Sequence, residues 1–187
     1  MGWQAKGDIS STSGMKANWT SSAAADMWWE AGGNITMPNI ESLNWTTSDA
    51  GKLLWRAGGN ISVSVPSGKS LIWSNGTSSG EILWDAGGSI IADNAGTSST
   101  FTFTQTGTGN TQWQARANIK AKGTKTFTSN PTNGSTMIWR AGGNIETTTD
   151  VAPSTVTFSK GSTAAGLMAW QAKGDIKTCL LYTSDAA

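Results

Sequence analysis

The sequence predicts an all-β fold, a β-solenoid or a trimeric β-fibre, with about six to seven repeats of 26–31 residues and roughly three short strands in each. Three observations predict it. A tryptophan-centred motif recurs along the chain, a second aromatic residue follows each of its first six copies, and 23 glycines in 187 residues mark frequent turns. Repeats of this length cannot bury an apolar face alone, so we expect them to stack on their neighbours.

The motif is Trp-x-Ala-x-x-x-Ile. Apolar residues precede the tryptophan, as in Leu53-Leu54-Trp55, and this is typical of a strand. Gly-Gly follows the alanine in four copies, Lys-Gly in two and Arg-Ala in one, and an Asn, Asp or Ser comes next. We expect a sharp corner here, with glycines at positive φ angles, and a new strand from the isoleucine. The seven copies are residues 3–9, 29–35, 55–61, 84–90, 113–119, 139–145 and 170–176.

A second aromatic residue, followed by a hydroxyl residue, comes 14 to 19 positions after each of the first six motif tryptophans. It predicts the third strand of each repeat. Loops such as residues 66–69 and 75–80 join the strands, and their variable length accounts for the variable repeat. The six pairs are Trp19-Thr20, Trp45-Thr46, Trp73-Ser74, Phe101-Thr102, Phe127-Thr128 and Phe158-Ser159.

The motif tryptophans are expected in the core, because each lies in fixed register with an unvarying Ala and Ile. In a solenoid, equivalent residues stack about 4.8 Å apart, so seven rows make a rod of roughly 30 Å. The position after each tryptophan supports such stacking, since no like charges fall in adjacent rows, where they would destabilise the sheet. These residues are Gln4, Glu30, Arg56, Asp85, Gln114, Arg140 and Gln171.

Composition excludes several classes of function. The chain has 13 Lys and Arg against 12 Asp and Glu, so its formal charge of +1 gives no reason to expect nucleic acid as a partner. With no His and one Cys, the chain cannot assemble a His/Cys zinc site, a Ser-His-Asp triad or a Cys-His pair. We expect no metal, no cofactor and no catalytic residues.

An enzyme would therefore have to use carboxylates, and these are scattered near turns of different repeats. A glycosidase needs two carboxyl groups held about 5 to 9.5 Å apart across a cleft, and nothing in the sequence marks such a pair. The carboxylates in question are Asp8, Glu30, Asp85 and Asp175. The sequence predicts a protein that is not an enzyme.

The candidate binding residues lie on the third strand. Trp19, Trp45 and Trp73 are less regular than the motif tryptophans, so we expect partial exposure and a tentative role in stacking on sugars. The neighbouring hydroxyls could instead form an ice-binding face, for which Thr-x-Thr pairs at 102–104 and 126–128 are the nearest match. This hydroxyl column is Thr20, Thr46, Ser74, Thr102, Thr128 and Ser159.

Residues 1–178 are expected to form one β-repeat array, a fragment of a longer protein. Residues 179–187 lack the repeat pattern and hold the only Cys and the only Tyr. They resemble the translated sequence of a sequencing adapter and are interpreted as a non-native tail. The given chain shows no signal peptide and no apolar segment long enough for membrane insertion.

Two other architectures stay open at this point. Residues 48–55 look like the repeat of quinoprotein-type β-propellers, although a four-stranded blade takes about 40–45 residues. An intertwined fibre of three chains would place the core between chains, and the sequence separates it poorly from a one-chain solenoid.

The Ala-Gly-Gly-Asn-Ile element at Ala31, Ala57 and Ala141 resembles filamentous-haemagglutinin-type bacterial adhesins and the shafts of bacteriophage tail fibres. The resemblance implies a structural or adhesive segment of an extracellular, cell-surface or virion fibre. Implied partners are further copies of the chain, as a homotrimer or end to end, and a cell-surface glycan. The alternative is a carbohydrate-binding or ice-binding module on a β-solenoid.

Overall fold

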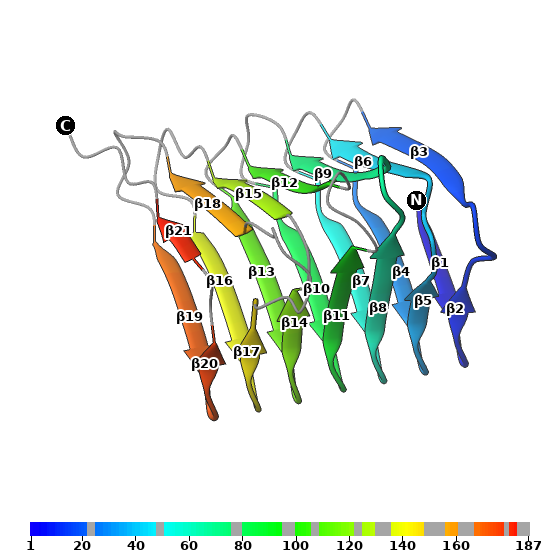
Figure 1. Ribbon diagram of the computed structural model, residues 1–187. Helices are drawn as coiled ribbons and strands as arrows, with labels where there is room; N and C mark the ends of the chain where they lie inside the picture. The colour runs from blue at the N-terminus through cyan, green and yellow to red at the C-terminus, as the bar shows by residue number, and fades with distance from the viewer. Residues whose placement is uncertain are drawn as a thin grey trace.

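The computed structural model is a β-solenoid, in which the chain winds through three parallel sheets and advances along one axis (Figure 1). The structure describes residues 1–21, 25–47, 51–75, 80–94, 100–105, 109–121, 125–129, 136–147, 156–160, 167–177 and 180–182. Each coil contributes one strand to each sheet, and each sheet has seven strands. The expected fold class is therefore confirmed.

Sheet A holds the motif tryptophans. Its strands, in spatial order, are β1 (Gly2–Ala5), β4 (Met27–Ala31), β7 (Leu53–Ala57), β10 (Ile82–Ala86), β13 (Asn110–Ala115), β16 (Thr136–Ala141) and β19 (Met168–Ala172).

Sheet B starts at the motif isoleucines. Its strands are β2 (Ile9–Ser10), β5 (Ile35–Met37), β8 (Ile61–Val65), β11 (Ile90–Asn94), β14 (Ile119–Ala121), β17 (Ile145–Glu146) and β20 (Ile176–Lys177).

Sheet C carries the second aromatics. Its strands are β3 (Lys16–Ser21), β6 (Ser42–Thr47), β9 (Ser70–Asn75), β12 (Thr100–Gln105), β15 (Lys125–Ser129), β18 (Val156–Lys160) and β21 (Leu180–Tyr182). Strand β21 lies in the segment interpreted above as a non-native tail, and its Tyr182 is in register with Phe158.

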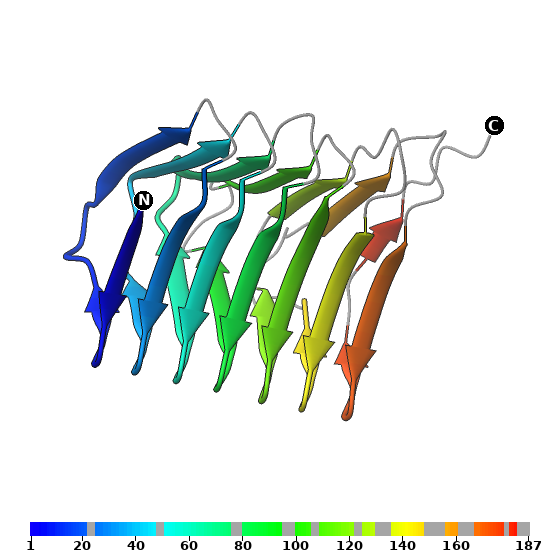
Figure 2. The same cartoon turned by 180° about the vertical axis from the view of Figure 1, so that it is seen from behind.

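The register is set by the motif. Every motif tryptophan pairs with the tryptophan of the next coil, as Trp55 does with Trp84, and the alanine and isoleucine rows pair in the same way. A slip by one residue would turn the whole tryptophan row to solvent, so burial fixes the pairing. Figure 2 shows the sheets from behind.

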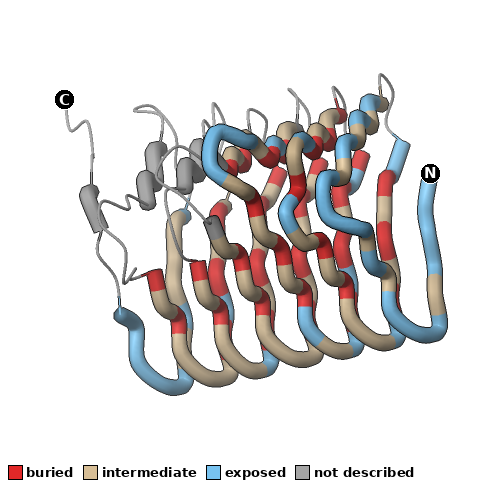
Figure 3. The backbone as a smooth tube through the Cα atoms, turned by 45° about the vertical axis from the view of Figure 1, so that its right-hand side comes forward, coloured by how far each residue is buried: buried red, intermediate tan, exposed pale blue. Residues whose placement is uncertain are grey.

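The core lies inside a single chain, so neither a propeller nor a core shared between three chains is needed to bury it. Inward positions alternate with outward ones along each strand, which gives the alternating buried segments in Figure 3. The stacked indoles of sheet A have centroids 4.7 to 5.1 Å apart and are within 9° of parallel from Trp3 to Trp139. The burial of the motif tryptophans is confirmed for Trp29, Trp55, Trp84, Trp113 and Trp139. In the two terminal coils Trp3 is 53% exposed and Trp170 is partly buried.

The expectation that the glycines at the corner between sheets A and B adopt positive φ angles is wrong. Among the described residues only Asn39, Gly14 and Gly68 do so. Where the corner holds two glycines, successive coils approach closely: a Cβ on Gly58 would lie 2.2 Å from the carbonyl oxygen of Gly32. Arg116 and Lys173 occupy the same position in two other stacked coils. Backbone hydrogen bonds continue through the corner, such as Gly59 N–H to Gly33 O at 2.8 Å.

A ladder of side-chain oxygens holds the same corner together. The Oδ1 atom of Asn34 accepts the backbone N–H of Asn60 at 2.8 Å, and Oδ1 of Asn60 accepts that of Ser89 at 2.7 Å. The ladder begins at Asp8 and continues to Asp175. This is why the residue before each isoleucine is Asn, Asp or Ser: each offers an oxygen to the next coil.

Candidate functional site

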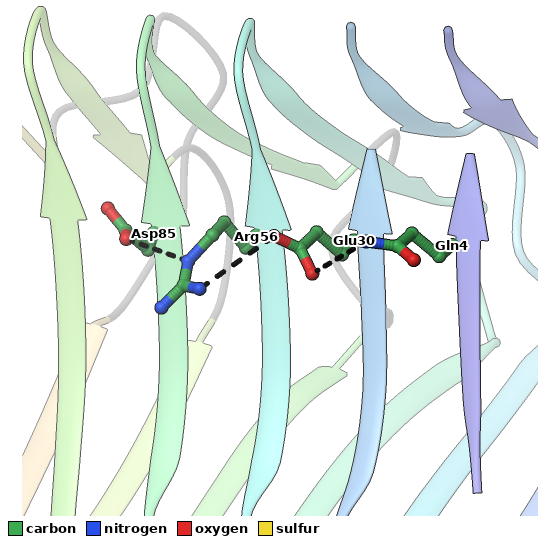
Figure 4. Close-up of polar contacts among 4 residues, drawn as sticks. All are labelled: Gln4, Glu30, Arg56 and Asp85. Carbon is green, nitrogen blue, oxygen red and sulfur yellow. Dashed lines mark hydrogen bonds and ion pairs between the residues drawn. The ribbon is translucent and has the colours of Figure 1, made fainter. Parts of the chain in front are cut away.

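The outward face of sheet A carries a row of polar side chains that interact from coil to coil (Figure 4). The Nε2 atom of Gln4 donates to Glu30 at 3.4 Å, and Arg56 lies between Glu30 at 3.8 Å and Asp85 at 3.3 Å. Further along, Arg140 Nε donates to Gln171 Oε1 at 2.9 Å. The alternation of charge seen in the sequence is thus a set of contacts between neighbouring strands.

Two shallow hollows lie beside this row, where sheet A meets the corner. The first, of about 360 Å³, has Glu30, Arg56, Asp85 and Arg116 in its lining, so its charges cancel. The second, of about 390 Å³, has Asp85, Arg116, Arg140 and Lys173, and carries an excess of positive charge. Both are open to solvent, and neither contains a pair of carboxylates that faces across it without an intervening cation.

The four carboxylates singled out in the sequence have structural partners. Oδ1 of Asp8 accepts the backbone N–H of Asn34 at 2.6 Å, and Asp175 lies 3.8 Å from Lys177. Glu30 and Asp85 are on opposite sides of Arg56, whose guanidinium fills the space in which a sugar would have to lie between two catalytic carboxyls. No group of three or more metal-ligating side chains occurs among the described residues.

Two side chains have a pKa that is shifted by an ion pair. A hydrogen bond from Lys16, at 2.9 Å, lowers the pKa of Glu41 from its usual 4.5. A hydrogen bond to Glu81, at 3.0 Å, raises the pKa of Lys52 from its usual 10.5. Both pairs lie at the surface and join neighbouring coils. We therefore interpret them as contacts that stabilise the stacking of coils and not as acid–base catalysts.

The second aromatics form a ladder of their own, and the expected exposure of two of them is wrong. Trp45 and Trp73 have relative exposures of 1% and 0%, which leaves no ring face for a sugar. They pack edge-to-face against the motif tryptophans, with Trp55 and Trp73 centroids 4.9 Å apart at 85°. Trp19 is partly buried and makes the same kind of contact with Trp29. Three sheets converge on a narrow core, so both aromatic rows point inward and fill it.

In the hydroxyl column on sheet C, Thr20, Thr46 and Ser74 face outward as expected, but the prediction is wrong for Thr102. Thr20 pairs with Thr46 and Thr46 with Ser74, and the Thr46 hydroxyl donates to Thr20 Oγ1 at 3.2 Å. Ser74 then pairs with Thr104 and not with Thr102.

The aromatic ladder likewise continues through Phe103, in register with Trp73, and not through Phe101, which pairs with Leu71. Strand β12 contains two aromatic residues, Phe101 and Phe103, each followed by a threonine, so counting from the motif tryptophan does not decide between them. Thr128 and Ser159 lie in strands of the same sheet, in the register columns expected for them.

One feature of the corner escaped sequence reasoning. The coil that carries Arg116-Ala117 in place of two glycines is the one stacked on Ser89, the only serine among the corner residues that otherwise are Asn or Asp. In the sequence, Ser89 and the Arg116-Ala117 pair are exceptions to the motif in consecutive repeats, and this coincidence is the signal from which their contact could have been predicted.

Comparisons with known proteins add no assignment: no family model, no curated protein and no solved structure matches this chain. Among the described residues there is no helix of the length and apolarity that a membrane-spanning segment requires.

Proposed function

We propose that this chain is a non-enzymatic structural and adhesive β-repeat segment of an extracellular, cell-surface or virion fibre. The observation that carries the proposal is the unbroken stack of motif indoles along the axis, from Trp3 to Trp139, with three parallel sheets around it. Such a stack places apolar rings in contact from coil to coil, which is what a load-bearing rod requires.

The cross-coil contacts support the same function. Hydrogen bonds run along the axis through all three sheets, through the backbone of the corner and through the ladder of side-chain oxygens at the same corner. Charged pairs such as Lys16–Glu41 and Lys52–Glu81 also join neighbouring coils. Pulling along the axis would have to break these contacts coil by coil.

Self-association, as a homotrimer or end to end, is part of the proposal. A further coil from another copy of the chain would pair with β1, β2 and β3, each of which is hydrogen-bonded to one neighbouring strand in the order of its sheet. Trp3 lies on β1 with 53% exposure, so the same addition would cover an indole face. A cell-surface glycan is the proposed adhesive partner.

Light scattering on a size-exclusion column, with electron microscopy of the same fractions, tests the proposal. The full chain is expected to form a stable trimer or a series of end-to-end multimers of rod shape. A monodisperse monomer over the whole accessible concentration range would overturn the fibre assignment. Binding of neutral or acidic sugars by such a monomer would favour a lectin.

A further inference from the structure

Two columns of residues run along the middle of sheet C, and they have an unusual composition. The first consists of Asn18, Asn44, Ile72, Thr102, Thr126 and Thr157, and the second of Thr20, Thr46, Ser74, Thr104, Thr128 and Ser159. In β3, β6, β9 and β12 these residues alternate with inward-facing aromatics, so they face away from the core. In β15 and β18 they occupy the same register positions.

The two columns carry no charge. Eleven of their twelve positions hold a hydroxyl or amide side chain, and the twelfth is Ile72. The outward positions of sheet A, in contrast, carry Glu30, Arg56 and Asp85, and those of sheet B carry Lys120 and Glu146. A face that is merely solvated would be expected to share these charges, so the two columns differ from the outward rows of sheets A and B. The charge nearest to them on β3 is Lys16, which is paired with Glu41.

The columns also have a regular geometry. Neighbouring strands repeat at about 4.8 Å along the axis, and residues i and i+2 of one strand lie about 6.6 Å apart. The backbone positions of the two columns thus form a rectangular lattice, and Thr102 and Thr104 are followed in register by Thr126 and Thr128 and then by Thr157 and Ser159. Threonine is stiff at χ1 because it is β-branched, so the lattice is preorganised.

We propose that this face of sheet C binds ice. Hexagonal ice presents oxygens at comparable spacings in both directions, and the rigid hydroxyl and methyl groups would hold water at lattice positions at little entropic cost on binding. Both columns lack charged groups, which would order water molecules around themselves and so disturb an ice-like arrangement. The face is most regular around Thr104, because at the other end Thr20 and Thr46 hydrogen-bond to each other.

The inference depends only on sheet C and is independent of the fibre function. The test is thermal hysteresis and inhibition of ice recrystallisation by the full chain, with Thr104→Lys as the disruptive variant. Ser62→Lys is the matched control, since Ser62 is an outward, partly exposed position of sheet B. Thr102→Lys is a second disruptive variant, and tryptophan emission and circular dichroism establish that each variant is folded.

We expect the unmodified chain and Ser62→Lys to shape ice and inhibit recrystallisation, and at least one folded Thr→Lys variant to lose this activity several-fold. Absence of activity in the unmodified chain would overturn the proposal, as would an equal loss in Ser62→Lys. Retention on crystalline cellulose without any effect on ice would overturn it as well and assign the face to a neutral polysaccharide. Oligomeric state, measured on the same samples, reports separately on the fibre function.

Discussion

Ala117 occupies the second corner position in the coil that stacks on Ser89, whose Oγ accepts the backbone N–H of Asn118 at 3.2 Å. In the six other coils this position is glycine, and in five of them a Cβ there would lie 2.1 to 2.4 Å from the Oδ1 atom of an Asn or Asp in the preceding coil. Serine is shorter than asparagine, so it leaves room for the methyl group of alanine. The two exceptions compensate for each other.

This relationship predicts a coupling between two substitutions. Ser89→Asn alone should bring Oδ1 against the Cβ of Ala117 and destabilise the protein by about 1–3 kcal/mol, as overpacking does. Ala117→Gly alone should cost up to about 1 kcal/mol through backbone entropy. The double variant should recover most of the stability. Denaturant unfolding of all four proteins measures the coupling, and additive effects would contradict the compensation.

The close approach at the corner predicts an unequal response of two glycines to alanine. Gly58→Ala should cost about 2–3 kcal/mol, because the new Cβ would lie 2.2 Å from a backbone oxygen that cannot move freely. Gly7→Ala is the control, since a Cβ there meets nothing within 4 Å. The free energy of unfolding measured for each variant tests this. Equal effects would mean that the corner needs glycine for its backbone freedom and not for space.

The charge row on sheet A predicts a salt-dependent effect. Arg56→Glu would place three carboxylates in adjacent strands, between Glu30 and Asp85, and should destabilise the protein by about 1 kcal/mol. Added salt should reduce the loss, because the side chains are exposed and screened. Arg56→Gln is the control and should change stability by less, with little dependence on salt. The measurement is thermal unfolding at low and high ionic strength.

The second aromatic ladder predicts which ring can replace Trp73. Trp73→Phe should cost about 1–2 kcal/mol, because phenylalanine already fills the equivalent position at Phe103 in the next coil. Trp73→Ala should cost about 3–5 kcal/mol through the cavity it leaves. Chemical unfolding distinguishes the two. A Trp73→Ala variant as stable as the unmodified chain would mean that the ring is not part of the core.

The titration behaviour predicts a broad stability plateau. The chain has no His, the one side chain whose ordinary pKa lies between about pH 5 and pH 8. Lys16 lowers the pKa of Glu41 in the folded protein, and this interaction adds to the free energy of unfolding at any pH above the pKa that Glu41 has in the unfolded chain. The added stability is lost as the pH falls through the lower pKa of the folded protein.

Glu81 raises the pKa of Lys52 in the folded protein, and this interaction adds to the free energy of unfolding at any pH below the pKa that Lys52 has in the unfolded chain. The added stability is lost as the pH rises through the higher pKa of the folded protein. Stability should therefore decline at the acid and alkaline ends and change little between them. Urea unfolding across the pH range tests this, and a clear transition near neutral pH would contradict it.

Sequence reasoning captured the fold because the information that defines it is local and repeated. The unvarying Trp, Ala and Ile identify the inward face of two strands in every repeat, and burial of that face admits only one register. The outward row from Gln4 to Gln171 follows from the same alternation. For the candidate site, the sequence placed Thr20, Thr46 and Ser74 on the outward column but mistook Thr102 for Thr104.

The remaining features depend on neighbours 26 to 31 residues away, across loops of variable length. Register in sheet C is set by pairing in space, so Phe103 and not Phe101 continues the aromatic ladder. The burial of Trp45 and Trp73 follows from the convergence of three sheets on one core. The corner glycines are required by the coil beneath them, and that crowding exists only once the coils are stacked. The sequence thus determined that the motif Trp, Ala and Ile face inward, because their pattern is local and repeated. The tertiary structure decided that the second aromatics are buried as well and which residues of successive coils meet, because both depend on how the coils stack.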